Sequence, residues 1–150
     1  MRKSRSARVL LPEPVLPMMP IRSPASMRKE TSLSAHRGLE GSAVFFVAVG
    51  EDGAVRGYVG MHHILDEADI TNVAVFPAAR RQGVGRALIQ AVADYAAKQA
   101  LVRVTLEVRA SNAAAIALYE GFGFVQDGRR PRFYSDPTED ALLYSRYTLQ

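Results

Sequence analysis

Apolar residues recur along most of the chain with two different spacings. Early on they form short runs, rich in β-branched and aromatic residues and separated by turn residues, which is typical of consecutive strands. From Val84 to about residue 99 they instead return every three or four positions, which predicts an amphipathic helix. The strands that precede this helix are expected at residues 43–49, 54–65 and 70–76.

Strand-like and helix-like patterns of apolar residues continue to alternate towards the C-terminus. Residues 102–108 alternate as a strand, and Ser111 is expected to cap a helix that ends at Gly121. Residues 122–125 and 141–149 are expected as the last strands, joined by a loop, QDGRRPRFYSDPTED, that is rich in turn residues. The order β-β-β-α-β-α-β-β predicts a mixed α/β domain, in which helices pack on the faces of a mixed sheet.

The first 42 residues show neither spacing of apolar residues. They hold five of the eight prolines, and proline blocks both helices and central strands. Several of these prolines, together with Glu13, interrupt the apolar residues near the N-terminus. This interruption argues against a secretory signal peptide. A short helix over residues 26–39 is the one element expected here. We therefore divide the chain into an atypical basic, Pro-rich segment, 1–42, and one folded domain, 43–150.

Composition and charge narrow the function classes. The net charge is +4, but residues 1–40 hold eight Lys/Arg against three Asp/Glu, a surplus of five, and the remaining 110 residues hold 11 against 12. The folded body is therefore not basic, and direct nucleic-acid binding is not expected. The chain has no cysteine, which excludes disulfides, thiolate metal sites and a cysteine nucleophile and favours the cytoplasm. No apolar run reaches the roughly 18 residues that a membrane span needs.

The stretch RRQGVGRA, residues 80–87, places two glycines where the long helix begins. Glycine weakens a helix, but here it would bare unpaired backbone N–H groups at the positive helix end and let a phosphate approach closely. The dinucleotide fingerprint is excluded because Leu88 occupies its third small position, and the Walker motif is excluded because Gly-Lys-Ser/Thr is absent. On this motif alone, a glycine loop that merely turns the chain stays open as an alternative.

The motif resembles the acetyl-CoA signature of the GNAT superfamily of N-acetyltransferases, Arg/Gln-x-x-Gly-x-Gly/Ala, which stands here as Arg80 to Gly85. The stretches LDEADITNVAVFPAARRQGVGRALI, LEVRASNAAAIALYEGFGF and RPRFYSDPTEDALLY resemble its ribosomal-protein-alanine N-acetyltransferases (RimI-type). The resemblance begins near residue 43 and is close over 65–144. It implies a central mixed, mostly antiparallel sheet with helices on both faces and a splayed pair of parallel strands that holds acetyl-CoA.

The resemblance also implies which residues bind acetyl-CoA. A strand with free edge groups can pair with a peptide-like partner, and residues 73–75 are expected to pair with the pantetheine arm. Backbone N–H groups of residues 81–86 are expected to hold the pyrophosphate. The full set of expected cofactor residues is Val73, Ala74, Val75, Arg81, Gln82, Gly83, Val84, Gly85, Arg86 and Asn112.

Two residues are implied as catalytic. Glu107 matches the family's general base, and Tyr119 matches the acid that protonates the leaving thiolate; the N–H of Val75 is a further candidate, for the oxyanion. An α-amine titrates near 8 and a lysine near 10.4, so an α-amine needs only modest help from a base. From the residues alone, Glu107 paired with Arg109 or another cation and Tyr119 packed in the core stay open as alternatives.

The acceptor side is less constrained by the sequence. In this superfamily the loop between the last strands often borders the acceptor peptide, which makes Tyr134 a candidate peptide contact, although the ring would equally pack on the sheet. His62 and His63 are neighbours in a strand and point to opposite faces, so no metal site is expected. Family members open with a strand and helices that complete the acceptor site, and residues 1–42 do not show this pattern.

The leading interpretation is transfer of acetyl from acetyl-CoA to the N-terminal α-amine of a protein, of the ribosomal-protein alanine type, by direct attack in a ternary complex. Acetylation of a small amine and a CoA-binding module without turnover are the alternatives. A monomer or weak dimer without membrane association is expected.

Overall fold

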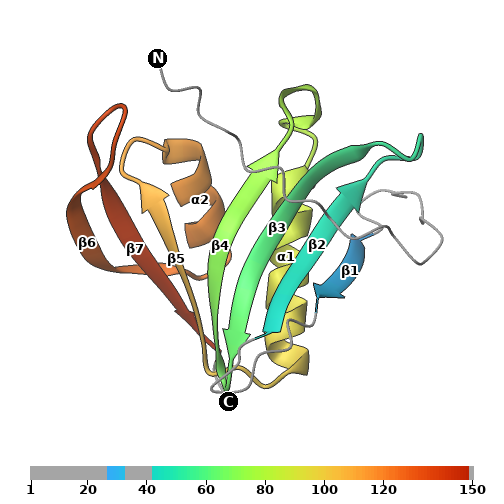
Figure 1. Ribbon diagram of the computed structural model, residues 1–150, viewed down its shortest axis with the longest axis horizontal. Coiled ribbons are helices and arrows are strands. Elements are labelled where there is room, and N and C mark those ends of the chain that lie inside the picture. Colours follow the sequence, from blue (N-terminus) through green and yellow to red (C-terminus); the bar gives the residue numbers. More distant parts are fainter. Residues whose placement is uncertain (1–26, 33–41, 149–150) are drawn as a thin grey trace.

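A computed structural model describes residues 27–32 and 42–148 of the chain (Figure 1). The strands form one seven-stranded sheet in the order β1-β2-β3-β4-β5-β7-β6. Among the described strands only β4 and β5 pair in parallel, and all other neighbours are antiparallel. The elements are β1 Met27–Ser32, β2 Ser42–Val49, β3 Val55–Ile64, β4 Glu67–Val75, η1 Pro77–Ala79, α1 Val84–Lys98, β5 Arg103–Arg109, α2 Ala113–Gly121, β6 Val125–Tyr134 and β7 Glu139–Tyr147.

From residue 42 onward the order of elements is the predicted one, and the prediction of a mixed, mostly antiparallel sheet with one parallel pair is confirmed. The core lies between the sheet and the helices, where α1 contributes its apolar stripe. Strands β2 to β5 place alternate residues against that stripe. Buried members of this core include Val44, Val59, Met61, Ile70, Leu88, Ile89, Val92, Leu106 and Val108.

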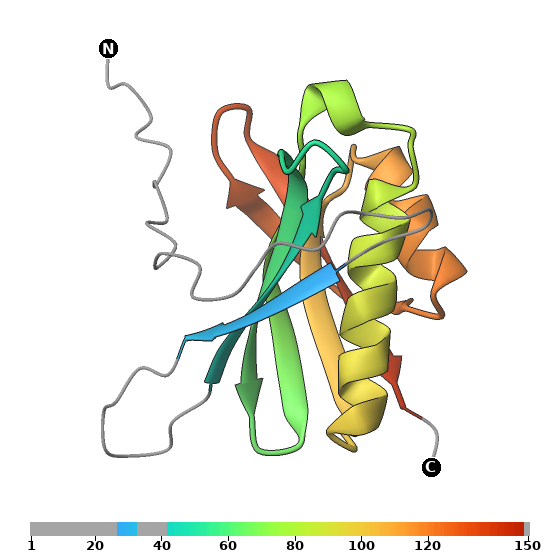
Figure 2. The same cartoon turned by 90° about the vertical axis from the view of Figure 1, so that its right-hand side faces the viewer.

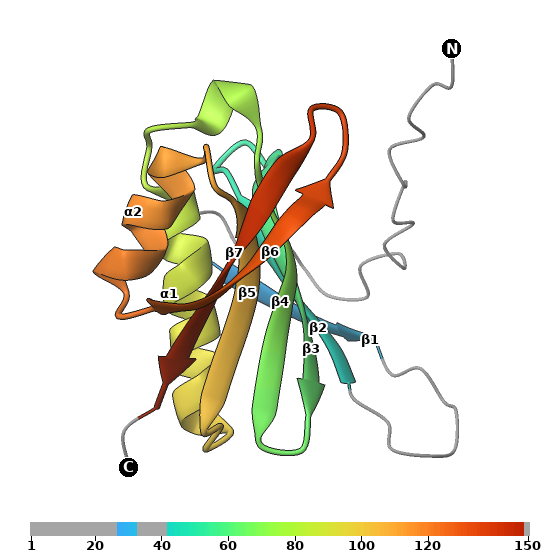
Figure 3. The ribbon, with the colours of Figure 1, turned by 90° about the vertical axis from the view of Figure 1, so that its left-hand side faces the viewer.

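Both helices of the described residues, α1 and α2, pack on the same face of the sheet (Figures 2 and 3), so the helices on both faces that the resemblance implied are not seen within these residues. The topology explains the difference. Strands β4, β5 and β6 point in one direction and succeed one another across the sheet in one sense. Two right-handed crossovers, β4-α1-β5 and β5-α2-β6, therefore place their helices on one face. We call the opposite face the distal face.

Two segments depart from the prediction. Residues 27–32, expected within a helix, form strand β1, which pairs with β2 from Met27↔Ala48 to Ser32↔Ala43. An unpaired strand edge offers backbone hydrogen bonds that local sequence patterns do not encode, so the tertiary contact overrides the helical pattern. The sheet thus begins inside the segment set apart as 1–42, and the division at residue 43 stays a prediction. Inferences drawn on residues 1–26 and 33–41 lie outside the described residues.

The second departure is strand β6, most of which was expected as a loop. Residues 122–124 are not in the strand, which runs over Val125–Tyr134 and pairs with β7. It is an outer strand with two register irregularities, and most of its residues are exposed. Such a strand lacks the apolar alternation that marks a half-buried one, and Pro131 is tolerated there because outer strands and bulges can accommodate proline.

No helix in residues 42–148 is long and apolar enough to cross a membrane.

Candidate active site

The parallel strands β4 and β5 separate halfway along their length. Their pairing starts at Glu67↔Arg103 and ends at Ile70↔Leu106. Beyond that point β4 stays paired with β3, and β5 stays paired with β7. The register of β3 against β4 also shifts there, leaving Thr71 as an extra residue in β4, which marks a β-bulge. The predicted splayed pair is therefore confirmed.

A cleft of about 360 Å³ opens where the strands part. It brings together five of the residues that the sequence singled out, from four elements and from the loop before α2. Two of the lining β5 residues, Leu106 and Val108, belong to the core on the helix face, while Glu107 and Arg109 alternate to the distal face. The cleft thus spans the sheet from one face to the other. Its lining residues are Ile70, Thr71, Asn72, Val73, Leu106, Glu107, Val108, Arg109, Asn112, Tyr119 and Tyr134.

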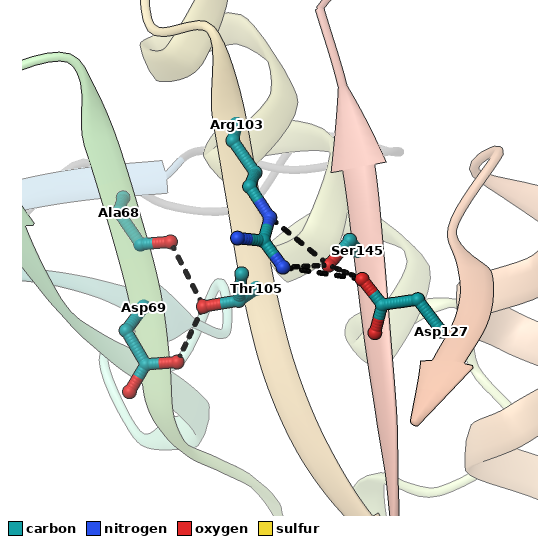
Figure 4. A network of polar contacts seen from close by, with 6 residues as sticks. All are labelled: Ala68, Asp69, Arg103, Thr105, Asp127 and Ser145. Carbon is teal, nitrogen blue, oxygen red and sulfur yellow. Dashed lines mark hydrogen bonds and ion pairs between the residues drawn. The ribbon is translucent and has the colours of Figure 1, made fainter.

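Below the point of separation, polar side chains on the distal face tie four strands together (Figure 4). Thr105 donates its hydroxyl to Asp69 at 2.7 Å, which joins β5 to β4. Arg103 donates to the buried hydroxyl of Ser145 at 2.9 Å and to Asp127 at 3.1 Å, which joins β5 to β7 and β6. The strands are therefore fixed just below the cleft, and the gap above them has a rigid base.

Tyr119 enters the cleft from α2 and is only 7% exposed. Its ring packs edge-on against Phe124, with 6.0 Å between the ring centroids. Burial raises the pKa of Tyr119 above its ordinary value of 10.0, and negative charge on Tyr134 would raise it further. Burial also raises the pKa of Tyr134, and the nearby Glu107 acts in the same direction. Both phenols are therefore protonated at physiological pH.

Glu107 forms an ion pair with Arg130 of β6, at 3.2 Å between Oε1 and Nε. Of the open alternatives, the structure realises the pairing with another cation rather than with Arg109. Arg109 instead lies over the ring of Tyr134, 4.3 Å from its centroid, and forms an ion pair with Glu139 at 3.4 Å. Arg109 also donates to the carbonyl of Pro137 at 3.3 Å. These contacts fasten the β6–β7 hairpin to β5 beside the cleft.

The glycine motif forms the loop and first turn of α1, at the carboxyl end of β4 (Figure 1). Gly83 is the N-cap with φ 78°, a left-handed conformation that favours glycine. No side chain caps this end and its first turn holds no acidic residue, so its leading N–H groups have no partner within the helix. At Gly85 a Cβ would lie 3.3 Å from Leu118 of α2, which is tighter than ordinary contact.

The remaining cofactor candidates lie around the same end of the sheet. Asn112 lines the cleft and is the N-cap of α2, where its Oδ1 accepts from the N–H of Ala115 at 3.2 Å. It replaces Ser111, the cap that the sequence predicted. Gln82 donates to the carbonyl of Ala78 at 2.9 Å, so its side chain braces the loop.

Residue Val73 lines the cleft, whereas Ala74 and Val75 continue β4 towards the loop and are not among its lining residues. Arg80 donates to the carbonyl of Val75 at 3.3 Å. Arg81 and Arg86 are exposed, and Arg81 has φ 58°. The motif therefore supplies a fixed turn around the free end of α1.

The two histidines occupy opposite faces, as predicted. The ring of His63 lies within hydrogen-bond distance of the Tyr95 hydroxyl, at 2.8 Å, and of the Leu65 carbonyl, at 2.7 Å, while His62 is exposed. Within residues 42–148 no three His, Cys, Asp or Glu side chains are grouped so as to hold a metal ion.

Sequence reasoning missed two neighbours of the predicted residues. Arg130 lies in the stretch expected as a loop, and nothing in the sequence pattern shows that its side chain reaches over β7 to β5. Asn72, whose amide lies 3.4 Å from the hydroxyl of Tyr58, lines the cleft because of the bulge at Thr71. The bulge in β4 leaves no mark in the apolar and polar alternation of this strand, so the sequence did not predict it.

Known proteins share this architecture and sequence. Residues 15–124 match the acetyltransferase (GNAT) family. The [ribosomal protein bS18]-alanine N-acetyltransferase of Escherichia coli is 43% identical over 95 residues, which are 62% of this chain and 64% of that protein. A crystal structure of the ribosomal-protein-alanine N-acetyltransferase from Escherichia coli superposes with a TM-score of 0.63 at 38% identity, over 73% of this chain and 70% of that one.

A second similar structure is that of an acetyltransferase named for another substrate. The crystal structure of nourseothricin acetyltransferase has a TM-score of 0.63 and 32% identity, and covers 70% of this chain and 65% of that chain. The family match spans well over half of the sequence and includes the splayed strands, the glycine motif and every residue that lines the cleft except Tyr134. The chain belongs to the acetyltransferase (GNAT) family.

Proposed function

We propose that the protein transfers the acetyl group of acetyl-CoA to the N-terminal α-amine of a protein, of the ribosomal-protein alanine type. The observation that carries the proposal is the cleft through the sheet, which gathers Glu107, Tyr119 and Tyr134 where β4 and β5 part. The similarity to the Escherichia coli ribosomal-protein-alanine enzyme supports the choice of acceptor. The protein acts in the cytoplasm as a monomer or weak dimer in this proposal.

The residues around the cleft fit acetyl-CoA. Beyond Ile70 and Leu106 the facing edges of β4 and β5 no longer pair with each other, so the backbone around Val73 is free to pair with the amide-containing pantetheine arm. The uncapped start of α1, with Gly83 and Gly85, suits a pyrophosphate. Asn112 would contact the cofactor beside α2. Acetyl-CoA supplies the activated acetyl group.

The acceptor amine approaches from the distal face in this proposal, because that is where Glu107 and Tyr134 border the cleft. An α-amine is largely protonated at pH 7, since it titrates near 8. Glu107 accepts its proton, directly or through water, and so frees the nitrogen lone pair. Tyr134, held by Arg109 at the mouth of the cleft, contacts the acceptor backbone.

The leaving thiolate needs a proton from the other side. Tyr119 comes from α2, on the helix face, and its raised pKa keeps the phenol protonated. It donates this proton to the departing sulfur. Glu107 and Tyr119 thus act on opposite sides of the reacting centre, and neither needs to form a bond to the acetyl group.

A panel of acceptors tests the proposal. CoA release is measured with peptides that begin with Ala or Ser, with the same peptides carrying a blocked N-terminus, with free lysine and with small amines. We expect release with the free Ala-type peptide and none with its blocked form. Release with small amines alone would favour the second candidate, which the likeness to nourseothricin acetyltransferase supports. Saturable acetyl-CoA binding without release for any acceptor would identify a CoA-binding module.

A further inference from the structure

We propose that Arg130 competes with the acceptor's ammonium group for Glu107. In the free protein the guanidinium of Arg130 pairs with the Glu107 carboxylate, and the acceptor displaces it on binding. The inference rests on the proposed function, because it assigns Glu107 to the acceptor side of the cleft. It adds a residue of β6 that sets how tightly the acceptor's N-terminus is held.

The contact joins strands that are not neighbours. Glu107 is in β5 and Arg130 in β6, and β7 lies between them. In the register, Glu107 is level with Leu143 of β7 and Leu143 is level with Gly128 of β6. Arg130 therefore reaches diagonally over β7 to bring Nε within 3.2 Å of the carboxylate. A cation thus already sits against the carboxylate that a substrate ammonium would approach.

This cation is held loosely. Among residues 42–148 no hydrogen bond accompanies this ion pair, whereas an arginine that binds a carboxylate firmly usually does so through two parallel hydrogen bonds. The Arg130 side chain is 56% exposed, so water competes for it and solvent weakens the attraction. The guanidinium also lies 5.6 Å from the centre of the Phe133 ring. This cation–π contact can hold it after it leaves Glu107.

Neighbouring arginines are fixed more firmly. Arg109 has an aromatic ring, a carboxylate and a carbonyl as partners. Arg129 donates from Nε to Asp140 at 2.6 Å and forms an ion pair with the same carboxylate through a second nitrogen. Among these three arginines around the hairpin, Arg130 is the one whose release breaks the fewest contacts.

The chemistry suits arginine at this place. Exchange of a guanidinium for an ammonium keeps the charge of Glu107 compensated in both states, so the half-buried carboxylate never stands alone beside the cleft. An arginine side chain stays protonated and is therefore no acetyl acceptor. A lysine at the same position would present a competing amine to the acetyl donor. The pairing of Arg130 with Glu107 therefore lowers the affinity for the acceptor but consumes no acetyl-CoA.

Equilibrium binding tests the inference without requiring turnover. A fluorescent peptide with a free N-terminal Ala, and the same peptide with an acetylated N-terminus, are titrated into the CoA-bound wild-type protein and its Arg130→Gln variant. We expect the free-amine peptide to bind about two- to fivefold more tightly to the variant, as befits loss of one exposed ion pair, and the blocked peptide to bind both proteins equally.

Arg56→Gln is the matched control. It also removes one arginine and one partly exposed ion pair, with Asp52 in the β2–β3 turn, and should leave both affinities unchanged. Weaker or unchanged binding of the free-amine peptide to Arg130→Gln would overturn the inference, as would equal tightening of the blocked peptide. The proposed function fails separately, if wild-type protein binds the free-amine peptide but releases no CoA. If neither protein binds that peptide, both proposals fail.

Discussion

The phenol of Tyr119 is buried at the gap between the splayed strands and has its pKa raised above 10.0 by that burial. A raised pKa means that the phenol keeps its proton until the pH exceeds 10, so the proposed proton donor is intact throughout the physiological range. Tyr119→Phe keeps the ring and its packing on Phe124 but removes the proton donor. We expect kcat to fall roughly 10²–10⁴-fold, with the KM for acetyl-CoA nearly unchanged.

Initial rates with saturating acceptor peptide check this expectation, and a thermal melt verifies that the variant is folded. A folded Tyr119→Phe protein with wild-type kcat would remove Tyr119 from the mechanism and leave it as a core residue.

The role proposed for Glu107 makes its importance depend on pH. If it takes the proton of an α-ammonium, it matters most where the amine is protonated, below the amine's pKa near 8. Glu107→Gln should therefore lower kcat/KM strongly at about pH 7, and the deficit should shrink as the pH rises past about 8. The rates of both proteins are measured across this range with one acceptor peptide. A deficit that is constant with pH would show that Glu107 does not act as the base.

Residues differ in how far the sequence reveals them. Strict alternation in β5 places Leu106 and Val108 in the core and so predicts that Glu107 faces away from it, as observed. The partner of Glu107 was not predictable, because Arg130 meets it across an intervening strand. The roles of Glu107 and Tyr119 came from the family resemblance, since a strand carboxylate and a helix tyrosine have commoner structural uses.

At the scale of elements, the β6–β7 hairpin is fastened to the β5–α2 loop by Glu139. Its carboxylate accepts a hydrogen bond from the N–H of Ser111 and forms an ion pair with Arg109. Hydrogen bonding from Ser111, and then Arg109, lowers the pKa of Glu139 below its ordinary 4.5. A lowered pKa in the folded state stabilises the fold above pH 4.5, and this stabilisation is lost as the pH falls through the lower, folded value.

Glu139→Gln should accordingly reduce the free energy of unfolding at neutral pH, and the difference from wild type should shrink as the pH falls below about 4.5. Urea titrations at neutral and acidic pH measure it. Because Tyr134 is held by the same arginine, the variant should also raise the KM for the acceptor peptide. An unfolding difference that grows on acidification would contradict this account of the hairpin.

The elements that the sequence predicted are those with a buried face. The helix α1 and the strands β2 to β5 each present an apolar stripe or alternation to one core, and their ends agree with prediction within a few residues. Strand β6 is an exposed outer strand that pairs through its backbone, and β1 likewise depends on the edge of β2. Backbone pairing leaves little trace in residue type, so β1 was missed and most of β6 was expected as a loop.

At the scale of the whole molecule, the topology gives the two proposed substrates opposite sides of the sheet. Both crossovers place their helices on one face, and the cleft through the splayed strands connects that face with the distal one. A cofactor seated along β4 and the start of α1 leaves Glu107 and Tyr134 accessible from the other side. In the proposed function both substrates are then bound at once, and the amine attacks the acetyl group directly. The chain has no cysteine that could carry the acetyl group instead.

This arrangement predicts the kinetic pattern. When acetyl-CoA and the acceptor peptide are varied together, double-reciprocal plots should intersect, because both molecules are bound before either product leaves. A conjugate that links CoA to the peptide N-terminus should bind more tightly than either half, since it pays the entropic cost of association once. Parallel lines, together with an acetylated protein detected by intact mass after incubation with acetyl-CoA alone, would instead require a covalent intermediate and would contradict transfer through the sheet.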